Sequence, residues 1–566
     1  MAGAGPAPPG GDPAAGPPGV GDVFVRGALL AAVQGEGVYA DCKHFVDMPL
    51  KAGASPRGVL EAFGRLPRDA GGRPARPALE AFLAEHFDAP AGALEPAALA
   101  DWRPEPPGFL PRVAHPRVRE WALNVHALWR LLGRRQHGAA GAGTLLPQGR
   151  PMVVPGERFR ETYYWDSYWV LEGLLVSGMH ETATGVVENL LQLLGAHGFV
   201  PNGSRLYYLN RSQPPLLSQM VRSLERHGVA GAGDLARRAL PLLVREHAFM
   251  TGGRRSLALE DAAGRSHTLA RYFCDVEAPR PESWREDVAA AAPLGEAARA
   301  ALFSEIAAAA ESGWDFSSRW MADGASLATL RTSKVVPVDL NVFLLLLEEN
   351  VAHFAGAAGE AGTAAAFGAR ARARREAIEA LMWDGDHLQW RDLIVEEVDV
   401  RFARAFAQSR GVYASNFVPL WAGCGGDRAA GVHGALLASG LVGPGGIATS
   451  LAASGQQWDF PNAWPPLQHM LIEGVARTDE ALARRLARAY LRNCHLTYLE
   501  TGMMHEKYDA TRPGHGGGGG EYRCQVGFGW TNGVALSLLD TFGWPEDEGD
   551  GEDGEDGEGE EGGAGG

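Results

Sequence analysis

Cysteine, long apolar runs and an excess of positive charge are all scarce in this sequence of 566 residues. The five cysteines, Cys42, Cys274, Cys424, Cys494 and Cys524, are scattered and form no Cys-x-x-Cys pair. Neither a zinc site nor a dense disulfide framework is therefore indicated, and the pairing of the five thiols stays open. No apolar run approaches the roughly 18 residues that a membrane-spanning helix needs.

The net charge of −16 comes mostly from the C-terminal end. Residues 545–566 hold eleven of the 68 acidic side chains and none of the 52 basic ones. The rest of the chain therefore carries 57 acidic against 52 basic residues, a charge of only −5. Such a balance leaves no excess of basic residues that could bind nucleic acid, and we expect no nucleic-acid partner.

Both ends of the chain are compositionally biased. Residues 1–22 are rich in Pro, Gly and Ala, and residues 545–566 in Gly and acidic side chains. Neither segment can bury enough apolar surface to offset the entropy of ordering, so we expect both to be disordered and residues 23–544 to form one large domain. The first twenty residues lack the basic start and apolar core of a signal peptide.

Apolar residues recur at helical spacing through most of the chain. The stretches 121–132, 340–354 and 467–475 place them three and four residues apart, which predicts helices that face a core. Alternation with a period of two is scarce, except for a short hairpin expected over 383–390, where Asp384-Gly385 supplies the turn. The pattern predicts an all-α fold whose active site is built by loops on one face.

Aromatic, acidic, arginine and amide side chains concentrate in the loops between these helices. The loops are residues 155–168, 201–215, 280–283, 311–316 and 457–465, and Glu506 and Glu521 follow near the end. This mixture is typical of a sugar site. Indole faces pack on pyranose rings, while arginine forks and carboxylates pair with hydroxyl groups.

Each of these residues also has a purely structural interpretation. Trp464 can be a core aromatic, and Asp166 and Asp459 follow tryptophans where a turn acid or helix cap also stands. Arg211 and Arg280 can be partners in structural ion pairs. The clustering of such residues in several loops is the stronger signal, and by itself it indicates a carbohydrate site.

A glycine run near the C-terminal end invites a different interpretation. Glycines at 514 and 516–520 could cradle a phosphate group, but no Gly-Lys-Ser/Thr follows them, and Glu521 would repel phosphate. The run is therefore not predicted to be a phosphate-binding loop.

The sequences of two of the loops are similar to motifs of a known family. Residues 155–168 and 457–466 resemble the two signature motifs of the trehalases, the family of inverting α,α-trehalose hydrolases. The likeness extends to residues 41–48, 311–320 and 506–531, and it spans about residues 38–543. The wording of the motifs looks most similar to that of animal members.

The resemblance implies an (α/α)6 toroid that hydrolyses trehalose to two glucose molecules. By motif, Asp315 takes the place of the general acid and Glu506 that of the general base. The implied sugar-binding positions are Arg158, Trp165, Asp166, Asn202, Arg211, Ser212, Gln213, Arg280, Glu282, Gly313 and Glu521. No metal, organic cofactor or obligate protein partner is implied.

The resemblance also implies a location. Animal members are typically exported and lipid-anchored, so an extracellular or cell-surface place is expected for this chain. Attachment to a membrane would need a lipid anchor, and the sequence shows neither an export signal nor an apolar anchor segment.

The chemical requirements of trehalose hydrolysis agree with the two catalytic roles. The 1,1-acetal of trehalose has no hemiacetal to open, so its cleavage needs an acid at the bridging oxygen and a carboxylate that activates water on the opposite face. Asp315 would need a raised pKa, most simply from burial beside Trp314. Glu506 must stay ionised, and the neighbouring Lys507 would favour its charge.

One position departs from the family motif. Glu157 stands in the first signature where a glycine is usual, directly before Arg158. A side chain there restricts the backbone and adds a carboxylate beside the arginine. It keeps open the alternative of a catalytically impaired trehalose-binding protein; a further alternative is another inverting glucosidase on the same toroid.

We predict that Glu157→Gly raises kcat/KM for trehalose, because it removes both the backbone restriction and a carboxylate that can divert Arg158 from the sugar. Glu157→Gln should raise kcat/KM only if the charge of Glu157 is the problem, and a partly exposed ion pair is worth roughly 0–1 kcal/mol. Steady-state kinetics of both variants beside the parent chain measures this. Equal kcat/KM in all three proteins would show that Glu157 is harmless.

Overall fold

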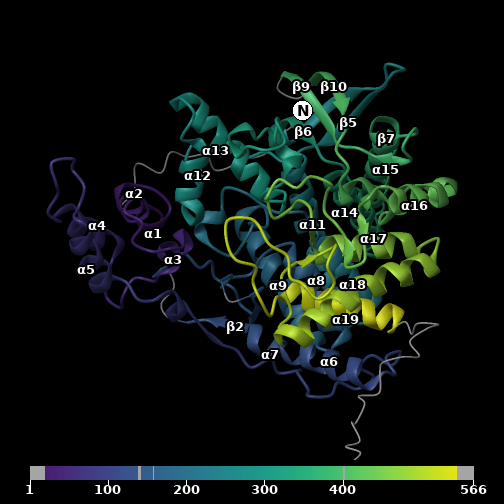
Figure 1. The fold of residues 1–566 in the computed structure, drawn as a ribbon, viewed down its shortest axis with the longest axis horizontal. Helices are drawn as coiled ribbons and strands as arrows, with labels where there is room; N and C mark the ends of the chain where they lie inside the picture. Colours follow the sequence, from purple (N-terminus) through teal and green to yellow (C-terminus); the bar gives the residue numbers. More distant parts are fainter. Residues whose placement is uncertain (1–18, 138–141, 157, 400–401, 545–566) are drawn as a thin grey trace, which may run out of the picture.

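The computed structural model describes residues 19–137, 142–156, 158–399 and 402–544 (Figure 1). The disorder predicted for residues 1–18 and 545–566 therefore falls outside the described residues. Helix α1 already begins at Val20, so the predicted boundary at residue 23 is three residues too late.

Helices dominate the described chain. Near the N-terminal end they are α1 (Val20–Phe24), α2 (Ala28–Gly35), α3 (Cys42–Asp47), α4 (Pro56–Gly64) and α5 (Arg76–His86). The main body contains α6 (Pro116–Ala127), α7 (Trp129–Leu132), α8 (Asp166–Val176), α9 (His180–His197), α10 (Leu217–Arg226), α11 (Ala232–Met250), α12 (Trp284–Ala291), α13 (Glu296–Glu311), α14 (Val338–Ala357), α15 (Ala361–Ala377), α16 (Ala429–Ala438), α17 (Pro465–Ala476), α18 (Glu480–Thr501) and α19 (Gly529–Phe542). Helices α6 and α7, α14 and α17 confirm the three predicted helical stretches.

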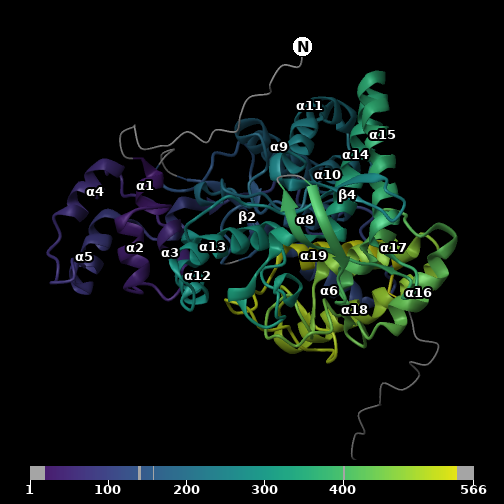
Figure 2. The same cartoon turned by 90° about the horizontal axis from the view of Figure 1, so that it is seen from above.

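Six buried helical segments close into a ring. In order around the ring they are α8, α10, α14, the 3-10 segment Ala414–Leu420, α17 and α19, and α19 packs back against α8. An outer helix backs each of them, namely α9, α11, α15, α16, α18 and α6 in the same order. This double ring of helices agrees with the predicted toroid (Figures 1 and 2).

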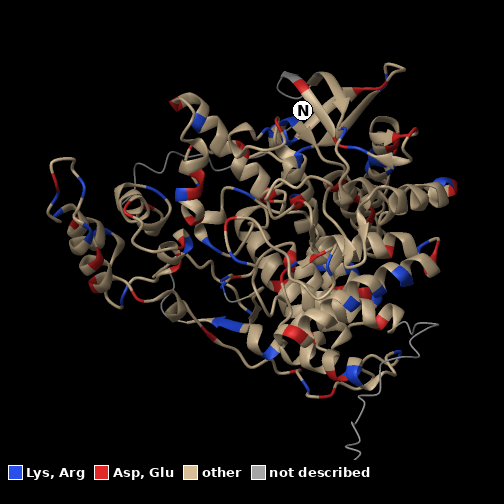
Figure 3. Ribbon diagram, in the orientation of Figure 1, with Lys and Arg blue, Asp and Glu red and all other residues tan. Residues whose placement is uncertain are grey.

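The inner helices α8 and α19 are buried around their whole circumference. In α8 every residue from Asp166 to Leu175 is buried, and in α19 every residue from Gly529 to Leu539. A helix without a polar face is stable only inside a protein, which explains why these segments form the inner ring. Basic and acidic residues are interspersed over the helices that surround them (Figure 3).

Local signals set the ends of the ring helices. Asp479 caps α18, accepting a hydrogen bond from the Leu482 N–H at 2.9 Å, and α18 stops at Gly502, whose φ is +71°. Helix α17 begins with Pro465-Pro466, which lack the N–H groups that a first turn leaves unpaired. An outer helix thus ends where a loop leads into the next inner helix, and these loops gather on one face of the ring.

Strands are more extensive than predicted. A five-stranded sheet runs in the order β5 (Ser266–Ala270), β4 (Ser256–Glu260), β10 (Phe402–Gln408), β9 (Leu393–Asp399) and β6 (Val335–Val336). Strands remain few and short beside the helices, as expected, but this sheet was not predicted, because five to seven residues are too short a window for alternation to stand out, and β10 is rich in alanine. The predicted hairpin is confirmed, since Trp383 pairs with Trp390 and Asp384 with Gln389.

The remaining strands are short. They are β1 (Leu94–Pro96), β2 (Gly133–Gln136), β3 (Met152–Val153), β7 (Trp383–Asp384), β8 (Gln389–Trp390), β11 (Val442–Gly443), β12 (Gly446–Ile447), β13 (Asn462–Ala463) and β14 (Tyr508–Asp509). The antiparallel pair β13–β14 joins the loop that precedes α17 to the segment that carries Glu506. It therefore holds two of the predicted site segments side by side.

Helices α1–α5 form a lobe at one end of the molecule in both ribbon views (Figures 1 and 2). A buried charge cluster ties this lobe to the loop before α8. Lys43 Nζ lies 2.5 Å from Asp47 and 2.8 Å from Glu161, and Arg205 Nε lies 3.0 Å from Glu161. Two cations and two carboxylates balance there, which makes burial of all four tolerable.

No described helix is long and apolar enough to cross a membrane.

Helices α8 and α19 approach more closely than most side chains allow. A Cβ atom added at Gly533 would lie 1.8 Å from the Trp169 carbonyl oxygen, and one at Gly173 would lie 2.5 Å from the Gly533 Cα. We predict that Gly533→Ala lowers the free energy of unfolding by about 2 kcal/mol or more, because backbone cannot move aside as a flexible side chain does. Thermal denaturation measures it.

The matched control is Gly434→Ala on α16, where an added Cβ meets nothing within 4 Å. This change should leave the protein unaffected or stabilise it by about 0.4–1 kcal/mol. Equal midpoints for the two variants would contradict the close packing of α8 on α19.

Candidate active site

The loops that precede the inner helices meet in one pocket with about 670 Å³ of empty space. The predicted site residues that line it are Arg158, Trp165, Asp166, Asn202, Arg211, Gln213, Arg280, Glu282, Gly313, Asp315, Glu506 and Glu521. Ser212 does not line it. Its N–H donates to Glu311 at 2.9 Å and its hydroxyl to the Val200 carbonyl at 2.6 Å, so it holds the loop behind the pocket.

Several lining residues were not among the predicted ones. They are Phe159, Tyr163, Tyr208, Ser283, Ala310, Gln457, Trp458, Trp464, Tyr522, Phe528 and Trp530. Most are aromatic, and an aromatic side chain by itself does not distinguish a ligand wall from a core. Their place inside or directly beside the predicted motif segments is the signal that could have identified them.

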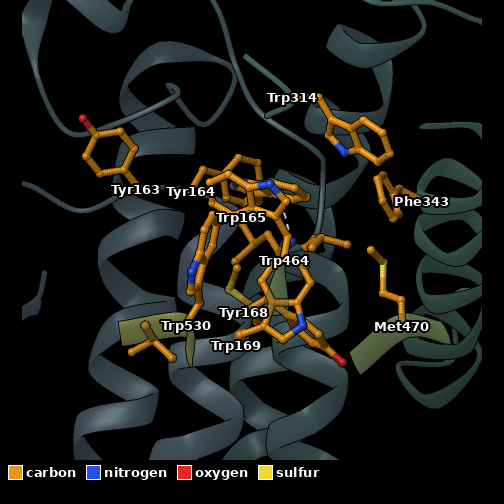
Figure 4. Packing of buried hydrophobic residues seen from close by; sticks show 14 of the residues in the cluster. Tyr163, Tyr164, Trp165, Tyr168, Trp169, Trp314, Phe343, Trp464, Met470 and Trp530 are labelled. Atoms are coloured by element: carbon orange, nitrogen blue, oxygen red, sulfur yellow. Dashed lines mark hydrogen bonds between the residues drawn. The ribbon is translucent and has the colours of Figure 1, made fainter. Parts of the chain in front are cut away.

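Stacked indoles form one wall of the pocket. The rings of Trp458 and Trp464 lie 4.0 Å apart with planes 3° from parallel, and Trp314 stacks on the other side of Trp458 at 5.4 Å. Trp530 stands at 90° to Trp464 with ring centres 5.5 Å apart (Figure 4). Flat apolar surfaces of this kind suit the apolar faces of sugar rings.

Gly313 brings the loop after α13 against this aromatic wall. Its φ of +77° favours glycine, and an added Cβ would lie 2.6 Å from the Trp165 ring. The indole of Trp165 therefore packs directly on the backbone two residues before Asp315. A larger residue at position 313 would push Trp165 and the Asp315 loop apart.

Asp315 projects into the pocket and keeps only part of its surface exposed. Removal from water raises the pKa of its carboxyl group to about 7. The positive charges of Arg280 and Arg211 pull that pKa down, and the negative charge of Glu521 pushes it up. The expected cause, burial, is thus the largest one, and Asp315 can hold a proton near neutral pH.

Glu506 is buried and held by donors on both oxygens. The Tyr522 hydroxyl donates to Oε1 at 2.8 Å, the Gln525 N–H donates to Oε2 at 3.3 Å, and Lys507 Nζ lies 3.9 Å from Oε2. The Trp530 indole N–H fixes the backbone by donating to the Glu506 carbonyl at 3.0 Å. These contacts fix the position of both carboxylate oxygens.

Asp166, at the first turn of α8, is a third acid in this pocket. Burial and the negative charges of Glu506 and Asp315 raise its pKa well above the ordinary value. The mutual influence shows that the three carboxyl groups face a common space, although they come from different loops.

Two buried polar atoms in the pocket have no protein partner. Arg211 donates through NH2 to Glu282 Oε1 at 2.5 Å. Among the described residues, however, Arg211 Nε and Glu282 Oε2 have no hydrogen-bond partner. A buried donor and a buried acceptor left open beside each other are costly unless a ligand satisfies them, and a vicinal diol offers both functions.

The other two arginines are each oriented by carboxylates. Arg280 pairs with Asp287 at 2.6 Å and reaches Glu521 at 3.1 Å. Arg158 donates two hydrogen bonds to Asp41, from Nε to Oδ2 at 2.7 Å and from Nη2 to Oδ1 at 3.0 Å. These contacts fix the guanidinium planes and leave other N–H groups for a ligand.

Glu157, the departure from the family motif, lies outside the described residues. All five cysteines are free thiols, and Cys524 is the one that is not fully buried. In the described part of the chain, no group of three or more His, Cys, Asp or Glu side chains could hold a metal ion.

The comparisons with known proteins agree with this geometry. The model of the trehalase family matches residues 37–543. A probable trehalase of Oryza sativa is 45% identical, covering 92% of this chain and 96% of the relative. The human trehalase is 41% identical, covering 93% and 90%. Plant and animal relatives are thus similar to about the same degree over the whole chain.

A solved structure extends the likeness to the fold. The neutral trehalase of Saccharomyces cerevisiae matches with a TM-score of 0.57 and 26% identity, covering 69% of this chain and 73% of that one. The (α/α)6 toroid implied by the motifs is therefore confirmed. Family model, relatives and fold agree, and this chain belongs to the trehalase family.

Proposed function

We propose that this chain hydrolyses α,α-trehalose to two glucose molecules by inverting acid–base catalysis. One observation carries the proposal. A single pocket combines a carboxyl group whose pKa is raised to about 7, Asp315, with a carboxyl group held by donors on both oxygens, Glu506. Cleavage of an acetal with inversion requires a protonated and an ionised carboxyl group of this kind.

In the proposed reaction Asp315 gives its proton to the oxygen that joins the two glucoses. Glu506 takes a proton from a water molecule, which attacks the anomeric carbon from the opposite face. Inversion requires the two carboxyl groups to stand roughly 6.5–9.5 Å apart, so that this water fits between them and the sugar. One glucose leaves as the β anomer and the other as the α anomer.

The remaining pocket residues bind and orient the disaccharide in this proposal. The open atoms of Arg211 and Glu282 pair with hydroxyl groups, and aromatic side chains of the pocket contact the apolar faces of the sugar rings. Arg158, Trp165, Asp166, Asn202, Gln213, Arg280, Gly313 and Glu521 complete the binding site. Ser212 acts through the backbone of its loop, since its own polar groups face Glu311 and Val200.

Sugar release from trehalose, maltose and sucrose tests the proposal. The purified protein should release glucose from trehalose alone, and NMR at early times should show equal α and β anomers, because one is formed by inversion and one is the leaving group. Two α anomers would mean retention and a different catalytic pair. Release from maltose would favour another glucosidase, and binding of trehalose without release an impaired protein.

We predict that kcat/KM falls as pH rises through about 7, since Asp315 acts only while it is protonated and its pKa is about 7. Well above that pH the loss should be tenfold per pH unit. Initial rates between pH 4 and pH 9 measure the profile.

Two variants control for this assignment. Asp315→Asn and Glu506→Gln should each lower kcat by at least about a thousandfold, because each removes one half of the acid–base pair, while the thermal midpoint stays within about 2 °C. Near-normal turnover in either variant would remove that residue from its proposed role.

A further inference from the structure

Lys507 is a fully buried ammonium group to which the proposed mechanism assigns no step. Its Nζ donates to the Gln457 side-chain oxygen at 2.8 Å and lies 3.9 Å from Glu506 Oε2. It also lies over the Trp464 ring, 4.7 Å from the ring centre. A cation out of contact with water is tolerated only where neighbouring groups compensate it, and here the neighbouring acid is Glu506.

Gln457 connects this ammonium group to the loop of the other catalytic residue. Its side-chain Nε2 donates to the Asp315 backbone carbonyl at 2.5 Å, while its Oε1 accepts from Lys507. Gln457 itself is fixed, because Asn462 and the Trp464 indole N–H both donate to its backbone carbonyl, at 2.9 and 2.7 Å. One amide thus spans from the Asp315 backbone to the cation beside Glu506.

The glycine run before Glu521 passes directly over this amide and ammonium. The Gly517 N–H donates to the Lys507 carbonyl at 2.9 Å, and an added Cβ there would lie 2.8 Å from the Lys507 side chain. At Gly520 an added Cβ would lie 2.9 Å from the Gln457 side chain. Glycine is therefore required at 517 and 520 by close approach to these two residues, which accounts for a motif that fitted no phosphate loop.

We propose that Lys507 and Gln457 are positioning residues that form a bridge between the two catalytic loops. In this bridge Gln457 fixes the backbone of Asp315, and the ammonium group of Lys507, 3.9 Å from Oε2, attracts the negative charge of the Glu506 carboxylate. The inference rests on the proposed function and adds to it the means by which two opposite protonation states are held in one pocket.

The charges that face Glu506 explain why Lys507 matters. From the pocket side, Asp166 opposes the negative charge of Glu506 when it is itself charged, and Asp315 lines the same pocket. From the loop after the glycine run, Tyr522 and the Gln525 N–H donate to its oxygens, and the Cys524 thiol lies nearby. Arg158 lies beyond the Tyr522 ring, at 4.7 Å from its centre. Without Lys507, only neutral hydrogen-bond donors would stabilise the Glu506 carboxylate against the negative charges of the two acids.

The test is the pH profile of kcat/KM on trehalose for the full chain, with Lys507→Met and Lys507→Arg beside the parent. In Lys507→Met the acid limb should move up by at least about one pH unit, as expected when an opposite charge at about 4 Å is lost. Its kcat at the optimum should fall at least about tenfold. Lys507→Arg keeps the charge and should keep the acid limb within about 0.3 pH unit.

A second variant tests the other half of the bridge. The Gln457→Glu variant keeps an acceptor for the Lys507 ammonium group, but it replaces the amide that donates to the Asp315 carbonyl by a carboxylate oxygen. The value of kcat should therefore fall at least about tenfold, while KM should change less than about threefold. The control is Lys334→Met, an exposed lysine away from the pocket, which should leave the profile unchanged.

The outcomes separate the bridge from the proposed function. An unmoved acid limb in Lys507→Met, or normal kcat in Gln457→Glu, in proteins of parental thermal midpoint would overturn the bridge. If Lys507→Met does not fold, the other two variants decide. Normal kcat in Gln457→Glu, or an acid limb in Lys507→Arg that moves by more than about 0.3 pH unit, would then overturn the bridge. A parent chain that releases no glucose from trehalose would instead overturn the proposed function itself.

Discussion

Burial of the inner helices around the ring governs where this chain can present polar chemistry. Helices α8, α17 and α19 pack against neighbours around their whole circumference, so a side chain on them reaches a ligand only at a helix end. Trp165 and Trp464 accordingly stand at the N-caps of α8 and α17, and Trp530 at the second residue of α19. The pocket lies where these helices begin, since the loops before them meet there.

A buried arginine just behind the pocket is fully paired, whereas one that lines the pocket is not. Arg319 donates to both oxygens of Asp339 and both of Asp392, at 2.8–2.9 Å, beneath the Asp315 loop. Such pairing stabilises the scaffold because a lone buried ion is costly. In the pocket, Arg211 and Glu282 keep an open donor and acceptor instead. The open atoms of Arg211 and Glu282 are therefore available to a ligand, while Arg319 has only a structural role.

The helical part of the fold could be predicted from the sequence, and the sheet could not. The apolar spacing of 340–354 belongs to a helix of twenty residues, α14, long enough for a period of 3.6 to be distinctive. The strands β4 and β5 have five residues each, and the pairing of β4 with β10 brings together Ala258 and Phe402, which are far apart in the sequence. A sequence window holds no information on such a partner. The contact of α3 with the loop before α8 was unpredictable for the same reason.

The candidate site could be predicted to the level of its motifs but not of each residue within them. Asp459 is a residue whose role the sequence alone could not decide. It sits in the second signature between two pocket residues, Trp458 and Trp464, and a sugar ligand and a turn acid were equally compatible with its position. The structure buries it away from the pocket, where it accepts from the hydroxyl groups of Ser317 and Ser318 at 2.9 Å and from the Ser318 N–H at 2.7 Å.

Asp459 therefore acts on the loop of Asp315 rather than on a ligand. A carboxylate can accept several hydrogen bonds at once, so this one side chain ties the second signature to the residues just after the candidate acid. Ser212 has the same character, since it anchors its loop through Glu311 while its neighbours Arg211 and Gln213 line the pocket. A motif preserves both the groups that meet the ligand and those that hold them in place, and only the direction of each side chain tells the two apart.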